Sequence, residues 1–291
     1  MLRVEGASPA HNPPASRLNR KDFMDSDRTD SAALQIARAF VSARDRAVPL
    51  VDFPGPLPPD MRYAYTVQEA AIGLRQDTVA GWKVGLVPPP EQAALHATRL
   101  AGPIFSSTVF RADAAVRLPA ITGGFAAIEV ELLAAVGRDA PPEKTDWTAA
   151  EAATMVGAWH LGVEFAASPL ATINDLGAAV VVCDFGNNSG LVVGGRIEAA
   201  DPAQLIFRTT IDGKQVGQAS AAGLPGGPLE SVRFLLGHLA QRRRPLRAGD
   251  WVSTGAITGV HRAFPGQHAS AEFLGGERID VSIVPARARG G

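Results

Sequence analysis

Cysteine is almost absent from this chain, with one residue, Cys183, among 291. No internal disulfide is therefore possible, which excludes a small secreted scaffold held together by disulfides. The three valines at 180–182 favour a buried structural thiol at this position. The alternative, a nucleophilic thiolate, requires a neighbouring base, and the local sequence indicates none.

Long apolar runs and a strong net charge are also missing. No stretch reaches the roughly 20 apolar residues of a membrane-spanning helix, and residues 1–23 lack the apolar core of a signal peptide. The formal net charge of −1 gives no basic surface for nucleic acid or an acidic membrane. The motifs GxGxxG, HExxH and GxSxG do not occur. We therefore expect a cytoplasmic protein without nucleic-acid or membrane partners.

The first part of the chain divides into a tail and a helical segment. Residues 1–28 are rich in proline, serine, asparagine and charge, a composition that predicts a disordered tail. Apolar residues at helical spacing begin near Ser31 and return at 65–74, on either side of the proline-rich loop 53–60. These patterns predict a helical N-terminal lobe over residues 29–80 and a catalytic domain over 81–291.

The second part is dominated by short β-prone runs separated by glycine turns. Strands are expected at 82–86, 128–133, 178–182, 191–193, 205–211, 251–253 and 279–284, and helices at 149–160 and 229–241. The basic run 242–244, with Arg247, is interpreted as a solvated helix C-terminus. The predicted fold class is α+β, with a mainly β catalytic domain and helices packed outside it.

Glu129 and Glu131 lie two residues apart in the apolar run 127–132, so in a strand both carboxylates project from the same face. One interpretation is a strand with one solvent-exposed (wet) face that carries both glutamates. The other is a ligand pair for Mg²⁺ or Mn²⁺, because hard divalent cations prefer oxygen and remove the repulsion between buried carboxylates.

Two further charged residues stand alone in apolar surroundings. Glu164 lies in the run 161–165, where it is either an edge or turn residue or a third carboxylate ligand. Lys83 lies in Gly-Trp-Lys-Val-Gly, where it is either a snorkelling lysine at a strand end or a group that holds a carboxylate or exchanges protons.

The polar segment 184–190, DFGNNSG, offers Asn and Ser side chains that can hold a carboxylate or carbonyl oxygen. A plain hairpin turn is the competing interpretation, since Asn and Gly are also turn formers. His261 and His268 bracket a Pro-Gly loop and are interpreted as surface residues rather than metal ligands.

The order of these segments resembles the 2-oxopent-4-enoate (2-keto-4-pentenoate) hydratase / 4-oxalocrotonate decarboxylase group of the fumarylacetoacetate hydrolase-like superfamily. The matching motifs are YTVQEA (65–70), GWKVGL (81–86), RLAGPIF (99–105), IEVEL (128–132), GVEF (162–165), DFGNNSGLVVGG (184–195) and LRAGDWVSTGAITG (246–259). The resemblance implies that the catalytic domain has the mixed β-roll fold of that superfamily. It also implies a homo-oligomer and a small 2-oxo acid as substrate.

The same resemblance assigns roles to individual residues. Glu129, Glu131 and Glu164 match the metal-binding glutamates, with Mg²⁺ or Mn²⁺ as cofactor, and Lys83 matches the lysine beside the substrate. The residues expected to bind substrate are Leu86, Phe185, Asn187, Asn188, Ser189 and Thr258. Where hydratases often carry an acid, this chain has Leu100, and where an arginine often follows the third glutamate it has Pro169. Substrate identity therefore does not carry over.

The sequence leaves three functions open. The first is a metal-dependent hydratase of aromatic catabolism, which adds water to a 2-hydroxy-2,4-dienoate through a metal-held enolate and forms a 4-hydroxy-2-oxo acid. The second is a metal-dependent 2-oxo acid decarboxylase of the 4-oxalocrotonate type, or a C–C hydrolase. The third is a catalytically silent structural partner.

Overall fold

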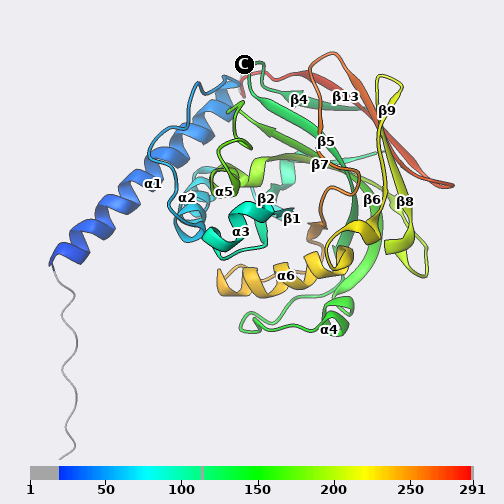
Figure 1. Cartoon of the computed structure of the whole chain (residues 1–291), viewed down its shortest axis with the longest axis horizontal. Coiled ribbons are helices and arrows are strands. Elements are labelled where there is room, and N and C mark those ends of the chain that lie inside the picture. Colours follow the sequence, from blue (N-terminus) through cyan, green and yellow to red (C-terminus); the bar gives the residue numbers. More distant parts are fainter. Residues whose placement is uncertain (1–19, 113–114, 290–291) are drawn as a thin grey trace, which may run out of the picture.

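The structure is a computed structural model that describes residues 20–112 and 115–289 (Figure 1). It begins with two helices, α1 (Arg20–Arg46) and α2 (Met61–Leu74). Ile36 and Phe40 recur at helical spacing and are buried, and Asp60 caps the first turn of α2 by accepting a hydrogen bond from the backbone N–H of Tyr63. The predicted tail lies mostly outside the described residues, but its last part, 20–28, belongs to α1.

Two sheets form the body of the protein. The larger has the order β2-β1-β10-β5-β6-β7-β3, with β11 also paired to β5, and the smaller has the order β4-β13-β12-β8-β9. The strands of the larger sheet are β1 (Val79–Leu86), β2 (Arg99–Phe105), β3 (Val109–Arg111), β5 (Phe125–Val136), β6 (Val156–Ser168), β7 (Asn188–Arg196), β10 (Trp251–Ser253) and β11 (His261–Arg262). Those of the smaller sheet are β4 (Val116–Ala120), β8 (Ile206–Ile211), β9 (Lys214–Ser220), β12 (His268–Phe273) and β13 (Arg278–Pro285).

The remaining helices lie on the side of the larger sheet that faces away from the smaller one, where the long strands β5 and β6 curl (Figure 1). They are α3 (Pro89–Leu95), α4 (Ala149–Ala153), α5 (Ala178–Cys183) and α6 (Gly227–Gln241). The 3₁₀ turns of the described chain are η1 (Ser106–Thr108), η2 (Phe185–Asn187), η3 (Pro202–Gln204) and η4 (Ala221–Gly223). In the described part of the chain no helix is both long and apolar enough to cross a membrane.

Residue alternation along β5 assigns its two faces to different cores. Ile128, Val130 and Leu132 pack toward the smaller sheet, whereas Glu129 and Glu131 project from the helix-covered face. The N-terminal helices share a core with that face, since Phe40 and Val67 belong to the same apolar cluster as strand residues. The division of the chain at residue 80 therefore stays a prediction.

Several local predictions need correction. The expected helix 149–160 ends at Ala153, because β6 begins at Val156 and pairs along the whole of β5. The expected strand 178–182 is helix α5, whose residues are all buried, and an apolar run buried on every side carries no periodicity to separate helix from strand. The segment 184–190 is not a hairpin turn: η2 connects α5 to β7.

The basic run after α6 is also only partly solvated. Arg242 is largely buried, stacks on the rings of Tyr65 and Trp82, and pairs with Glu69 at 2.5 Å. The other predicted elements, including α6 and the strands around residues 82–86, 205–211 and 279–284, are present with small shifts in their bounds.

Candidate metal centre

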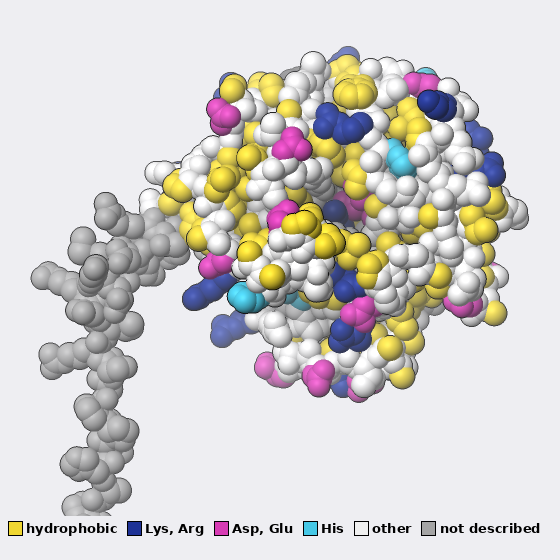
Figure 2. Space-filling view, in the orientation of Figure 1, with side chains coloured by type: hydrophobic (Ala, Val, Ile, Leu, Met, Phe, Trp, Pro, Cys, Tyr) yellow, Lys and Arg dark blue, Asp and Glu magenta, His cyan; other side chains and the backbone are white. Residues whose placement is uncertain are grey.

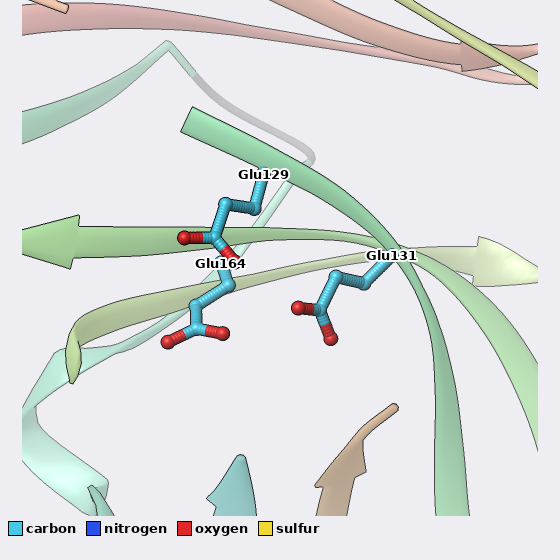
Figure 3. Close-up of side chains that lie close together, drawn as sticks. All are labelled: Glu129, Glu131 and Glu164. Atoms are coloured by element: carbon cyan, nitrogen blue, oxygen red, sulfur yellow. The ribbon is translucent and has the colours of Figure 1, made fainter. Parts of the chain in front are cut away.

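The pairing of two long strands brings three glutamates together. Glu129 on β5 stands directly opposite Glu164 on β6, and Glu131 stands opposite Gly162. Each carboxylate offers an oxygen, and these oxygens lie within 4.8 Å of one another (Figure 3). All three side chains are buried, so the wet-face and edge interpretations of these residues do not describe them.

The hydrogen bonds to this cluster are incomplete. Glu131 Oε2 accepts from Ser253 Oγ at 2.5 Å and from the backbone N–H of Gly255 at 2.9 Å, and Glu164 Oε1 accepts from the side-chain amide of Asn188 at 3.1 Å. Glu131 Oε1 and Glu164 Oε2 are buried without a partner. A buried carboxylate oxygen with no partner costs on the order of 1–3 kcal/mol or more. Carboxylate oxygens are hard ligands that carry no hydrogen-bond donor of their own when ionised, so the three glutamates fit a divalent cation such as Mg²⁺ or Mn²⁺.

The pKa values of Glu129 and Glu131 also fit a bound cation. Burial, followed by the charge of Glu164, raises the pKa of Glu129 to about 8, with Lys83 acting in the opposite sense. The pKa of Glu131 is raised well above its usual range by burial and by the other two carboxylates. A cation would favour the charged forms, because opposite charge offsets both the desolvation and the mutual repulsion.

Lys83 lies beside the cluster. Its Nζ is 3.4 Å from Glu164 Oε1 and 3.5 Å from Asn187 Oδ1, and its side chain is only 6% exposed. Burial alone would lower the pKa of this ammonium, but the attraction of the three glutamates outweighs burial and raises it. It is therefore held as a cation within reach of anything bound to the glutamates.

A cavity of about 430 Å³, here called the central cavity, opens onto Lys83 and Glu129. Figure 2 shows this face of the molecule hollowed, with basic and acidic atoms visible inside the recess. Apolar side chains form much of the wall, including Leu86, Leu100 and Val181. Lys83, Arg99 and Glu129 are the charged side chains among its described lining residues. Such a wall excludes water from a small acid and strengthens electrostatic interactions inside.

The residues expected to bind substrate divide between different places. Leu86 and Asn187 line the central cavity. Phe185, Asn188 and Ser189 line a second cavity on the other side of the η2–β7 segment, although the Asn188 amide reaches Glu164. Thr258 lines neither cavity and shares hydrogen bonds with Thr209 and His261.

The division follows from the backbone. Phe185, Gly186 and Asn187 all have positive φ, so the backbone makes a tight left-handed turn there, and Phe185 and Asn187 line different cavities. Gly102 on β2 permits this approach, since a Cβ at that position would lie 2.1 Å from the carbonyl oxygen of Phe185.

Some residues at the centre were not expected from the sequence. Ser253 and Gly255 hold Glu131, and Asn174 accepts a hydrogen bond from the Asn187 amide at 3.2 Å and lines the central cavity. Ser253 lies within one of the matching motifs, which was a usable signal. Asn174 lies in a connecting segment with no distinguishing pattern.

Comparisons with known proteins agree with this geometry. The sequence matches the family "Fumarylacetoacetate (FAA) hydrolase C-terminal" over residues 78–289, and the chain belongs to that family. It is 27% identical to a 2-keto-4-pentenoate hydratase from Burkholderia vietnamiensis over 235 residues, which is 78% of this chain and 86% of the hydratase. It is 31% identical to a 4-oxalocrotonate decarboxylase from Pseudomonas putida over 107 residues, 36% of this chain and 40% of the decarboxylase.

Among solved structures, a 4-oxalocrotonate decarboxylase from Pseudomonas putida G7, complexed with magnesium and adipate, superimposes with a TM-score of 0.71. The sequence identity is 20%, and the match covers 87% of this chain and 98% of that one. This likeness shows the fold: a mixed α+β architecture with a curled sheet and N-terminal helices. Family and glutamate cluster together indicate an enzyme with a carboxylate metal site.

Proposed function

We propose that this protein is a Mg²⁺- or Mn²⁺-dependent lyase that binds a small 2-oxo acid, or its dienol, in the central cavity. The observation that carries the proposal is the convergence of three buried carboxylates, two with an unpartnered oxygen, next to a largely apolar cavity that Glu129 lines. A divalent cation bound by Glu129, Glu131 and Glu164 would supply Lewis acidity to stabilise negative charge developing on the 2-oxo oxygen.

The surrounding residues have roles that follow from their positions. Lys83 is a buried cation suited to hold the substrate carboxylate or to exchange a proton with the substrate carbon chain. Asn187 orients Lys83 and is itself oriented by Asn174. Leu86 and Leu100 surround the carbon chain and limit access of bulk water.

The first candidate reaction is hydration of a 2-hydroxy-2,4-dienoate to a 4-hydroxy-2-oxo acid. It is supported by the sequence matches to 2-keto-4-pentenoate hydratases, which cover more of the chain than the sequence match to the decarboxylase. Within the cavity, Lys83 and Glu129 are the described groups placed to exchange protons with water or substrate.

The second candidate is decarboxylation of a 2-oxo dicarboxylic acid. One observation favours it: Leu100, which stands where hydratases often carry an acid, is 3% exposed and lines the central cavity. Adding water needs a base to activate it, whereas losing CO₂ needs an electron sink and then one proton. An apolar wall also favours loss of charge from a departing carboxylate.

One assay separates these candidates. The protein is incubated with Mg²⁺ and either 2-hydroxypenta-2,4-dienoate or 2-oxohex-3-enedioate, while ultraviolet absorbance and CO₂ release are followed. Hydration predicts loss of dienoate absorbance without CO₂. Release of CO₂ from the dicarboxylate with no consumption of dienoate selects decarboxylation instead. No turnover of either compound with saturating Mg²⁺ or Mn²⁺ contradicts both.

A further inference from the structure

The second cavity is small and strongly cationic. It has a volume of about 110 Å³, and its described lining residues include four arginines and no acidic side chain. We call it the arginine cavity and define it by Arg44, Arg75, Arg287 and Arg289. These residues come from α1, from the end of α2 and from the C-terminal segment, which lies beside the end of α1 (Figure 1).

The nearby carboxylates satisfy this charge only in part. Arg44 is held by Asp184 at 2.6 and 2.9 Å, behind the wall of the cavity. Asp45 is shared, since Arg75 contacts it at 3.0 Å and Arg289 approaches it at 3.9 Å. These two carboxylates therefore pair with three of the four guanidinium groups, those of Arg44, Arg75 and Arg289. A third acid, Asp77, is close enough to act on Arg75, but its oxygens accept hydrogen bonds from Ser106 and Ser107.

Arg75 is the clearest sign of an incomplete site. Its side chain is 6% exposed, and its Nε is buried with no hydrogen-bond partner. Burial, together with the like charges of Arg289 and Arg44, lowers the pKa of this guanidinium, which is the signature of a crowded cation. Its head stacks 5.2 Å from the ring of Phe105, so the surroundings are apolar on that side.

We propose that the arginine cavity binds a small oxyanion, in the chemical class shared by inorganic phosphate, sulfate and the carboxylate of a small acid. A cavity of this size admits one such group, and planar guanidinium groups match the oxygens of carboxylate and phosphate. Ser189 also lines it, and its hydroxyl, which accepts a hydrogen bond from Arg44, can donate to a bound anion.

An anion bound in the arginine cavity would hold the neighbouring segment 184–189 in place. The cavity lies against the segment 184–189, which presents Asn187 to the central cavity and Asn188 to Glu164. An anion that bridges Arg75 and Arg289 to Ser189 would hold this segment on the side away from the central cavity. The site is distinct from the glutamate cluster, so its occupancy does not depend on the proposed reaction.

The test is anion binding by the full-length protein without added metal. Thermal unfolding and isothermal titration are recorded with sodium phosphate, sodium sulfate and sodium acetate, each against sodium chloride at equal ionic strength. We expect a saturable rise in melting temperature above that seen in chloride, and a bound stoichiometry of one per chain. The three anions separate a phosphate-type ligand from a carboxylate.

Variants assign the effect to this cavity. Arg287→Gln/Arg289→Gln removes two cations at the end of the chain and is expected to weaken binding at least fivefold, and Arg75→Met is expected to abolish it. Arg247→Gln, which removes one positive charge as Arg75→Met does but at an exposed position, should bind as wild type does. Equal stabilisation by chloride, or binding unchanged in both cavity variants, overturns the proposal.

Discussion

Lys83 and Glu164 form an ion pair that is buried on both sides, with Nζ and Oε1 3.4 Å apart and side-chain exposures of 6% and 0%. Lys83 pairs with only one of three neighbouring carboxylates, and burial raises the pKa of the other two, Glu129 and Glu131. A divalent cation bound by the glutamates, as in the proposed function, would favour their charged forms, and Lys83 would then lie beside the position of a bound substrate acid.

This arrangement predicts that Lys83→Met separates catalysis from metal binding. The variant loses a cation next to the glutamates, so it should bind Mn²⁺ at least as tightly as wild type. Its turnover should fall by about 100-fold or more, the usual contribution of a positioned proton-transfer group. Titration calorimetry and steady-state kinetics on the same preparation provide the check. Parallel loss of metal binding and activity would show that Lys83 has a structural role instead.

Ser253 should act through Glu131. Its hydroxyl donates to Glu131 Oε2, and its backbone lies in β10 beside β5. Ser253→Ala removes a hydrogen bond that orients a ligand, and we expect metal affinity to fall by about 10–100-fold. Ser107→Ala, which changes a hydroxyl at an exposed site, serves as the control. Unchanged affinity in Ser253→Ala would contradict this role.

Substitution by alanine should have opposite effects on the free energy of unfolding at Gly102 and at Gly73. Gly102→Ala would place a Cβ against the Phe185 carbonyl, which should destabilise the protein by about 1–3 kcal/mol and disturb Asn187. Gly73 lies in helix α2 with open space around it, so Gly73→Ala should stabilise by about 0.5–1 kcal/mol. Urea unfolding of both variants measures the difference. Equal effects would mean that β2 and η2 do not approach so closely.

His238 should make stability depend on pH. Burial, followed by the charge of Arg242, lowers the pKa of this imidazole to about 3, against about 6.5 in the unfolded chain. Between these values the unfolded chain binds the extra proton, so this part of the stability is present above pH 6.5 and is lost as pH falls toward 3. At pH 5 the loss is about 2 kcal/mol.

The His238→Phe variant provides the measurement. Phenylalanine keeps the stack between Phe234 and Tyr65 without a titrating group. The stability of the variant relative to wild type should therefore increase as the pH is lowered from 7 to 5. A constant difference across this range would show that the imidazole is already free to protonate in the folded state.

Local patterns were sufficient for some features of the fold and site. The spacing of Glu129 and Glu131 placed both on one strand face, and helical periodicity located α6, because each feature depends on residues close in sequence. The apolar run at 178–182 was assigned to the wrong element for the converse reason: burial on every side removes periodicity.

Contacts between residues far apart in sequence could not be predicted from local patterns. The pairing of Glu129 with Glu164 depends on the register of two long strands, and only the ordered motifs of a resemblance suggested it. Arg44 and Asp184 are 140 residues apart, and no local pattern in either segment indicates their contact. The burial of Arg242 under α2 likewise depends on how α6 packs rather than on its own sequence.

The central claim, a divalent metal held by three glutamates, is tested most directly by titrating Mn²⁺ and Mg²⁺ into wild type and into Glu129→Gln/Glu131→Gln. The wild-type protein should bind one ion per chain and gain thermal stability. The double variant should remain folded, bind at least about 100-fold more weakly and show no metal-induced shift. Glu143→Gln, at an exposed position, is the control. Binding by the double variant as tight as that of wild type would contradict the account.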